Sequence, residues 1–223
     1  MTKTQANEKY PKRNGFYFFN TPQGELRLPS VTDILKVLDK PALMYWASKE
    51  SAKIALEDPT LTDKEVMSKF GEISKKASEK GKRIHSLYQA LFNNQEAGDN
   101  EVDKGYRKEI LKFIDEFVGE DIEGEKTVKS LNYGYAGTLD RKIKSKNGLI
   151  WIIDFKTSKA VYPEHKLQLE AYRVAEVEDN QKIDRTGVLL VREDGTYSLV
   201  ETKADFKIFL ALKTVWEWVK ENE

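Results

Sequence analysis

The amino-acid sequence predicts a mixed α/β protein, an α+β arrangement in which a helical N-terminal region precedes a core built around a β-sheet. Apolar residues recur at helical spacing between Asp58 and Asn94, whereas from about Glu125 short apolar runs alternate with turn sequences. The expected order is helices first and then β-β-β-α-β-β-α. At 223 residues the chain fits one domain, divided into a tail and short hairpin (1–28), a helical region (29–120) and a core (121–223).

Composition restricts the kinds of site that the chain can form. The 37 basic and 37 acidic residues cancel, which argues against a globally basic nucleic-acid binder and leaves a local basic patch for such contacts. The absence of cysteine excludes disulfides, thiolate zinc sites and an iron–sulfur cluster. No apolar run reaches the roughly 18 residues of a membrane span. Residues 1–15 resemble neither a signal nor a transit peptide and are expected to be a frayed tail, so we expect a cytoplasmic protein.

The N-terminal part of the chain contains a predicted hairpin followed by two predicted helices. Phe16–Phe19 and the residues around Leu26 would form the strands, with Pro22–Gly24 as the turn. Ser30 is a suitable N-cap for the first helix, because its hydroxyl can accept a hydrogen bond from an unpaired amide of the first turn. Pro41 suits the first turn of the second helix.

One long helix is expected between Asp58 and Asn94. Thr62 and Glu65 form a capping box, in which the two side chains accept hydrogen bonds from amides at the helix start. Between Thr62 and His85, basic residues outnumber acidic ones by seven to four. This excess is typical either of a solvated helix face or of a surface that follows a nucleic-acid backbone.

The remaining segments predict the sheet and its covering helices. A polar loop is expected over Asn93–Asn100, and turns at Lys146–Gly148 and Glu193–Gly195. Further helices are expected over Val102–Val118, Glu164–Val177 and Phe206–Val219, and strands over Lys126–Leu131, Tyr135–Ile143, Leu149–Phe155, Arg185–Val191 and Tyr197–Thr202.

Three residues in the stretch Gly134–Tyr172 suggest phosphodiester chemistry. Asp140 ends the segment GYAGTLD within one expected strand, Asp154 lies in the next, and Lys156 directly follows that strand. Hydrolysis of a phosphodiester needs a cation to offset charge on the phosphate and a water made nucleophilic. Mg²⁺ prefers oxygen ligands, so the two aspartates are candidate ligands. Side chains alternate along a strand, which places Lys156 beside Asp154, able to act on the water or the phosphate. The opposite face would pack against helices through Trp151, Ile153 and Phe155.

Six segments follow one another in an informative order, namely PSVTDIL (29–35), GKRIH (81–85), GEKTVKS (124–130), GYAGTLD (134–140), IIDFKTS (152–158) and LQLEAY (167–172). Together they resemble the PD-(D/E)XK phosphodiesterase superfamily, and within it the RecB-like branch that includes the mitochondrial genome maintenance exonucleases. The resemblance spans most of the chain. It implies a restriction-endonuclease-like fold, with a mixed β-sheet flanked by helices, and a single nuclease domain whose helical region covers the site.

The resemblance also implies a metal site. Asp140, Asp154, the backbone carbonyl of Phe155 and His85 would hold Mg²⁺ or Mn²⁺, and an imidazole ligand suits Mn²⁺ better. A lone helical histidine is more often structural, and this alternative stays open for His85. The second histidine, His165, is expected at the surface.

Four further residues receive roles through the same resemblance. Lys156 would activate the water, and Glu125 would assist at the metal or the water. Glu123 would share a strand face with Glu125 and makes that assignment less certain. Gln168 and Tyr172, spaced i, i+4, would position Lys156 and the phosphate, unless they form only the polar edge of an amphipathic helix.

These residues predict a metal-dependent deoxyribonuclease of bacterial, archaeal or phage type, an exonuclease that prefers single-stranded DNA ends. It would act in DNA repair, recombination or replication, with a replication or recombination protein as a further partner. The alternatives are a structure-specific endonuclease, a non-catalytic DNA-binding module, and a nuclease subunit of a larger complex. Tyr45, Trp46 and Phe70 would either stack on bases or pack in a core. The expected nucleic-acid contacts are Lys75, Lys76, Lys80, Lys82, Arg83, Thr157 and Ser158.

Overall fold

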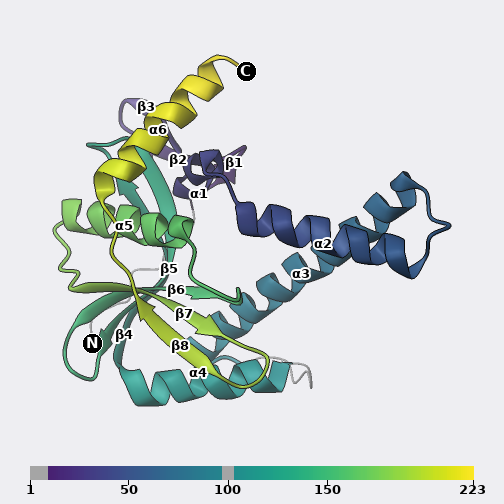
Figure 1. The fold of residues 1–223 in the computed structure, drawn as a ribbon. Helices are drawn as coiled ribbons and strands as arrows, with labels where there is room; N and C mark the ends of the chain where they lie inside the picture. Colours follow the sequence, from purple (N-terminus) through teal and green to yellow (C-terminus); the bar gives the residue numbers. More distant parts are fainter. Residues whose placement is uncertain (1–9, 97–102) are drawn as a thin grey trace.

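The computed structural model describes residues 10–96 and 103–223, which contain six α-helices and two β-sheets (Figure 1). The protein therefore has the mixed α/β architecture that its sequence predicts. A short 3₁₀ turn, η1 (Leu35–Val37), follows the first helix. The helices are α1 (Val31–Ile34), α2 (Pro41–Glu57), α3 (Asp63–Phe92), α4 (Lys104–Phe117), α5 (Pro163–Glu178) and α6 (Phe206–Glu221).

The larger sheet has five strands in the order β4-β5-β6-β7-β8, and the smaller has three in the order β1-β2-β3. Neighbouring strands are antiparallel except β6 and β7, which are parallel. A parallel pair needs a long crossover, and α5 supplies it. The strands are β1 (Lys12–Arg13), β2 (Phe16–Thr21), β3 (Gly24–Pro29), β4 (Val118–Ser130), β5 (Tyr135–Ser145), β6 (Ile150–Lys156), β7 (Arg185–Val191) and β8 (Tyr197–Glu201).

Two apolar cores lie on opposite faces of the five-stranded sheet. On one face α1, α5 and α6 pack over residues such as Ile152. On the other face α4 and the C-terminal part of α3 cover Trp151, Ile153 and Phe155, as strand alternation predicts. A third cluster joins the inner face of the β1–β3 hairpin to Ala136 of β5. The hairpin therefore covers the start of β5, around Ala136, in addition to the helices that cover the sheet.

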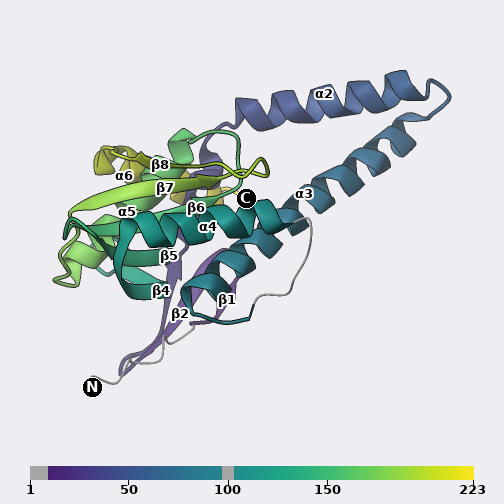
Figure 2. The ribbon, with the colours of Figure 1, turned by 90° about the horizontal axis from the view of Figure 1, so that it is seen from below.

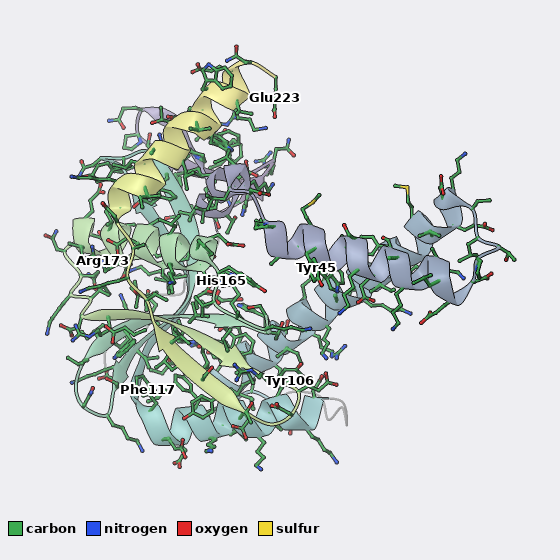
Figure 3. All side chains as sticks on the ribbon, in the orientation of Figure 1. Tyr45, Tyr106, Phe117, His165, Arg173 and Glu223 are labelled. Carbon is green, nitrogen blue, oxygen red and sulfur yellow. The ribbon has the colours of Figure 1, made fainter. Side chains whose placement is uncertain are left out.

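The N-terminal part of α3 leaves the body of the protein together with α2 (Figures 1 and 2). We call α2 and residues 63–80 of α3 the arm. Trp46 and Phe70 meet inside the arm with ring centroids 5.3 Å apart, so they pack between its two helices. Tyr45 is 72% exposed on α2 (Figure 3). The predicted helical region therefore divides into a projecting arm and a part that packs on the sheet.

The local motifs of the N-terminal half are confirmed. Ser30 caps α1 by accepting a hydrogen bond from the Asp33 amide, and Thr62 and Glu65 form the capping box of α3. The β2–β3 turn and the turn at Lys146–Gly148 also lie where they are predicted. Short-range hydrogen-bonding patterns were therefore sufficient to locate these helix starts and turns.

Two boundaries differ from the prediction. Residues predicted as tail include β1, which pairs with β2 through Asn14 and Gly15. Their φ angles of 49° and 81° are those of an Asn-Gly hairpin turn, a motif that the sequence contained. In addition, β4 begins at Val118, the predicted end of a helix.

Part of the prediction lies outside the described residues, namely residues 1–9 of the tail, 97–100 of the polar loop and Val102 at the start of a helix. Among the helices that the structure describes, none has the length and apolar character needed to cross a membrane.

Candidate active site

Two largely buried aspartates lie side by side at the end of the paired part of β5 and β6. Arg141 pairs with Ile153 in the antiparallel register, which makes Asp140 and Asp154 the next residues opposite each other. Asp154 is 1% exposed, and the side chain of Asp140 is 15% exposed. Ionised carboxylates this close repel each other, so the pair needs positive charge nearby.

Lys156 supplies one of these positive charges. It lies on the same face of β6 as Asp154, as the strand pattern predicts. Its Nζ is 2.7 Å from Oδ1 and 2.6 Å from Oδ2 of Asp154. The side chain is 26% exposed, so the ammonium group sits between the buried acid and solvent.

His85 reaches the acid pair from α3. Its Nε2 lies 3.2 Å from Oδ1 of Asp140, and the amide of Phe155 donates a 2.8 Å hydrogen bond to Oδ2. One turn further along α3, Tyr88 stacks on Phe155 at a centroid distance of 4.6 Å. This packing holds α3 against β6 and keeps His85 beside Asp140.

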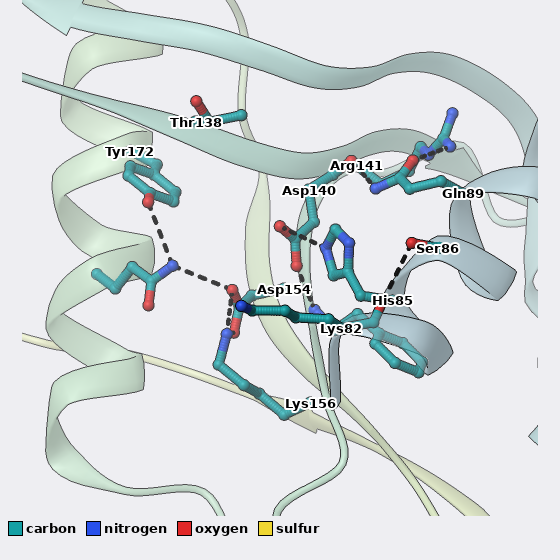
Figure 4. Close-up of polar contacts among 12 residues, drawn as sticks. Lys82, His85, Ser86, Gln89, Thr138, Asp140, Arg141, Asp154, Lys156 and Tyr172 are labelled. Carbon is teal, nitrogen blue, oxygen red and sulfur yellow. Dashed lines mark hydrogen bonds and ion pairs between the residues drawn. The ribbon is translucent and has the colours of Figure 1, made fainter. Parts of the chain in front are cut away.

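Tyr172 lies on α5 on the far side of Asp154 from His85 (Figure 4), and Gln168 of the same helix lies between Tyr172 and Asp154. Gln168 donates hydrogen bonds of 3.1 Å to Oδ1 of Asp154 and 3.2 Å to the hydroxyl of Tyr172. A Cβ on Gly137 would lie 2.3 Å from Tyr172 Cε1, so only glycine leaves room for this ring. Gln168 therefore orients Asp154, and both Gln168 and Lys156 donate to the same carboxylate oxygen.

The structure separates the two candidate glutamates on β4. Glu123 forms ion pairs with Lys126 at 3.3 Å and Lys142 at 3.1 Å. Glu125 has a φ of 47°, in the left-handed region, and its negative charge helps to raise the pKa of His85, after the larger effect of the Asp140 hydrogen bond. Glu125 is therefore the glutamate that faces the site.

Sequence reasoning missed Gln89 and Arg141. Gln89, one turn after His85, donates a 3.3 Å hydrogen bond to the backbone carbonyl of Asp140 and accepts one of 2.5 Å from Arg141. The guanidinium of Arg141 is buried and also binds Asp121 at 3.0 Å. Two features of the sequence indicate these residues: Gln89 follows His85 at i, i+4 spacing, and Arg141 directly follows Asp140. These contacts tie α3 to β5 beside the acid pair.

The four central groups shift one another's pKa values. Burial and the charge of Asp140 raise the pKa of Asp154 to about 6, against the effect of Lys156. Burial acts to raise the pKa of Asp140, but the His85 hydrogen bond and the Lys156 charge outweigh it and lower that pKa. Burial acts to lower the pKa of Lys156, but the two aspartates raise it. At neutral pH the acids are thus mostly ionised and Lys156 is protonated.

The donor set fits a hard cation. Carboxylate oxygens of Asp140 and Asp154 and an imidazole nitrogen of His85 are ligands that Mg²⁺ or Mn²⁺ accepts. Within the described residues, Asp154 Oδ2 is buried and accepts no hydrogen bond of normal geometry, and its close partner is the Lys156 ammonium 2.6 Å away. A cation at this oxygen would take the place of that ammonium. In that same part of the chain, no three His, Asp or Glu side chains are already gathered as metal ligands. A bound cation would therefore replace some of the ion pairs that these groups now make with one another.

An open cavity of about 500 Å³ lies next to these acids. Two of the predicted nucleic-acid contacts, Lys82 and Thr157, line it, and Ser158 instead donates a hydrogen bond to the Ala160 carbonyl. The lining residues are Gly81, Lys82, His85, Ser86, Phe155, Lys156 and Thr157.

Acids from distant parts of the chain neutralise part of the basic face predicted on α3. Lys80 forms a 2.5 Å ion pair with Glu193, and Arg83 a 2.9 Å ion pair with Asp103. Lys75 and Lys76 remain exposed on the arm. The excess of basic residues counted along the helix is therefore smaller in the folded protein.

His165 is not at the surface, contrary to the prediction. It is 8% exposed, and its Nδ1 accepts a 3.3 Å hydrogen bond from the amide of Tyr162 at the start of α5. Burial and the nearby charges of Lys156 and Lys40 lower the pKa of His165 to about 4. His165 is the buried residue of the first turn of α5, whereas Pro163 and Lys166 on the same turn are exposed, so the polar character of this segment did not indicate its burial.

Comparisons with known proteins leave the function open. No protein-family model matches the chain, and no curated protein matches it. Among solved structures, the protein described as "Crystal structure of SSO0001" is similar over 76% of this chain and 69% of its own, with 15% identity and a TM-score of 0.35. This likeness is too low to assign a function.

Proposed function

We propose that the protein is a metal-dependent DNA exonuclease of the PD-(D/E)XK superfamily, RecB-like branch, that prefers single-stranded ends. The observation that carries the proposal is the buried pair Asp140 and Asp154, with Lys156 on one side, His85 on the other, and an open cavity beside them. This arrangement concentrates two negative charges where one cation can bind, next to a protonated amine.

A bound Mg²⁺ or Mn²⁺ would offset charge on the phosphate and lower the pKa of a water molecule. Asp140, Asp154 and His85 would hold the ion, together with the Phe155 carbonyl and with Glu125 nearby. The protein's other contribution is to keep these ligands in place with few competing solvent contacts.

The protonated side chain of Lys156 would act as a positive charge held in place beside the two aspartates. Because its pKa is raised, Nζ carries three protons at neutral pH and can donate hydrogen bonds to the attacking water and to a phosphate oxygen. It can release a proton only when the charge of the neighbouring aspartates is offset. Gln168 holds Asp154 in orientation by its 3.1 Å hydrogen bond.

The cavity supports a nucleic-acid strand as substrate, because it is open and adjoins both His85 and Lys156. Lys82 and Thr157 on its walls can contact the phosphates. An enzyme that requires a strand end would not cut a closed circle.

The test uses linear and circular single-stranded DNA with Mg²⁺ or Mn²⁺, with either end labelled. We expect nucleotide release from linear DNA only, and a loss of about 10²–10⁴-fold in Asp154→Asn and Lys156→Ala. Lys144→Ala, an exposed lysine further along β5, is the matched control and should retain activity. Cleavage of circles would indicate an endonuclease. Binding without cleavage would indicate a non-catalytic module.

A further inference from the structure

The outer face of the β1–β3 hairpin combines aromatic rings with guanidinium groups. Arg13 lies opposite Phe16, and Arg27 opposite Phe18. The Cζ of Arg27 is 3.4 Å from the ring centroid of Phe16, and that of Arg13 is 5.1 Å from the ring centroid of Phe18. Both arginines are exposed and both rings are partly exposed, although one edge of the pair is covered because Phe16 also packs against Trp216 of α6 at a centroid distance of 5.5 Å. We call these four residues the aromatic–arginine face.

The two arginines of this face keep their charge available. Among residues 10–96 and 103–223, no carboxylate forms an ion pair with Arg13 or Arg27, whereas Lys80 and Arg83 of α3 are paired. Residues 10–29 contain three basic side chains and one acid, Glu25, in a chain whose total charge is zero. A guanidinium stacked on a ring also retains the N–H donors at its edge.

The hairpin is attached to the strand that carries Asp140. The Tyr17 hydroxyl on its inner face lies 2.8 Å from Thr138 Oγ1. Ser30, which directly follows β3, forms a parallel β-bridge with Ala136 of β5. Thr138 precedes Asp140 by two residues, about 7 Å along a strand, and on the same side. The hairpin is therefore anchored to β5 two residues before Asp140.

We propose that the aromatic–arginine face binds single-stranded nucleic acid. Bases stack on exposed ring surfaces and on guanidinium planes, which are accessible only when the bases are unpaired. The edge N–H groups of Arg13 and Arg27 bind phosphates. This inference rests on the proposed function in one respect: it supplies the strand that the site would cut.

The experiment measures binding of fluorescent oligo(dT) and of a duplex to the full chain in EDTA, by anisotropy at several salt concentrations. We expect Arg13→Ala/Arg27→Ala to raise the Kd for oligo(dT) about tenfold or more. The slope of log K against log salt should fall by about 1.4, because each lost contact to a single strand removes about 0.7. Arg13→Lys/Arg27→Lys keeps the charge and should retain the slope but lose part of the affinity.

Lys203→Ala/Lys207→Ala is the matched control, since it removes the same charge from two exposed lysines at the start of α6. Equal effects of the two double variants would overturn the proposal. So would equal binding of duplex and single strand, or no binding by the unmodified protein. Because EDTA prevents metal-dependent cleavage, this experiment measures binding independently of nuclease activity. If the Arg13→Ala/Arg27→Ala variant binds more weakly but the unmodified protein cleaves no DNA, only the proposed activity is contradicted. If the unmodified protein cleaves DNA but the variant binds as tightly as it does, only the proposed surface is contradicted.

Discussion

The two halves of α3 share one sequence pattern but have different surroundings. From Lys82 onwards the helix lies on the sheet, where Ile84 and Tyr88 are fully buried and His85 meets Asp140. Before that point it lies in the arm, where Phe70 is only half-buried and Met67 is 73% exposed. Helical spacing of apolar residues thus predicted the helix correctly, but the packing partner decides what each half contributes. We expect the C-terminal half to carry stability and chemistry, and the arm to carry little of either.

The largest expected difference is in stability. Tyr88→Ala should lower the free energy of unfolding by about 3–5 kcal/mol, because it empties a fully buried site between Phe92 and Phe155. Phe70→Ala in the arm should cost roughly 1 kcal/mol, because less area is removed from contact. Urea unfolding measures both. Similar losses would show that the arm belongs to the cooperative core.

The next effect concerns activity. His85→Ala should lower the metal-dependent nuclease activity about 100-fold and weaken Mn²⁺ binding, because a ligand to the cation is lost. Glu72→Ala, an exposed residue of the arm, is the control on the same helix. Unchanged Mn²⁺ affinity in His85→Ala, measured by calorimetry, would contradict a ligand role and favour a structural histidine.

A smaller effect is expected on lowering the pH. Asp154, with a pKa of about 6, must lose its proton to bind a cation, so protons compete with the metal below that value. His85, the other proposed ligand that titrates, has a raised pKa and also takes up a proton as the pH falls. Apparent Mn²⁺ affinity should therefore begin to fall near neutral pH, and fall by about tenfold or more per unit below about pH 6, where Asp154 is protonated as well. Calorimetry from pH 5 to pH 8 would test this. In Asp154→Asn this dependence should be reduced, and a profile identical to that of the unmodified protein would exclude Asp154 as its source.

The smallest effect is expected from the exposed lysines of the arm. Lys75→Ala/Lys76→Ala should weaken binding of single-stranded DNA about threefold and slightly flatten its salt dependence. Lys80 adds little to this because Glu193 already pairs with it. The same titrations in EDTA provide the measurement. No change in affinity or slope would leave this part of α3 as a solvated face.

The sequence by itself determined the local structure and part of the chemistry. The capping box of Thr62 and Glu65 is confirmed because both partners lie within one helical turn. Asp154 and Lys156 share one face of β6 because side chains alternate along any strand. The Asn14–Gly15 turn is equally local, because an Asn-Gly pair by itself favours a two-residue hairpin turn. Such features depend on residues only a few positions apart, which a single sequence displays directly.

The tertiary structure alone decided which distant charges meet. Glu193 neutralises Lys80 across 113 residues, and Arg141 reaches Gln89 across 52. No periodicity along the chain encodes such pairs, because they depend on how α3, α4 and the strands dock together. The same docking buried His165, and it left Arg13 and Arg27 stacked on aromatic rings rather than paired with acids. Counting charge along one element could therefore locate basic residues, but only the packed structure showed which of them remain available to a ligand.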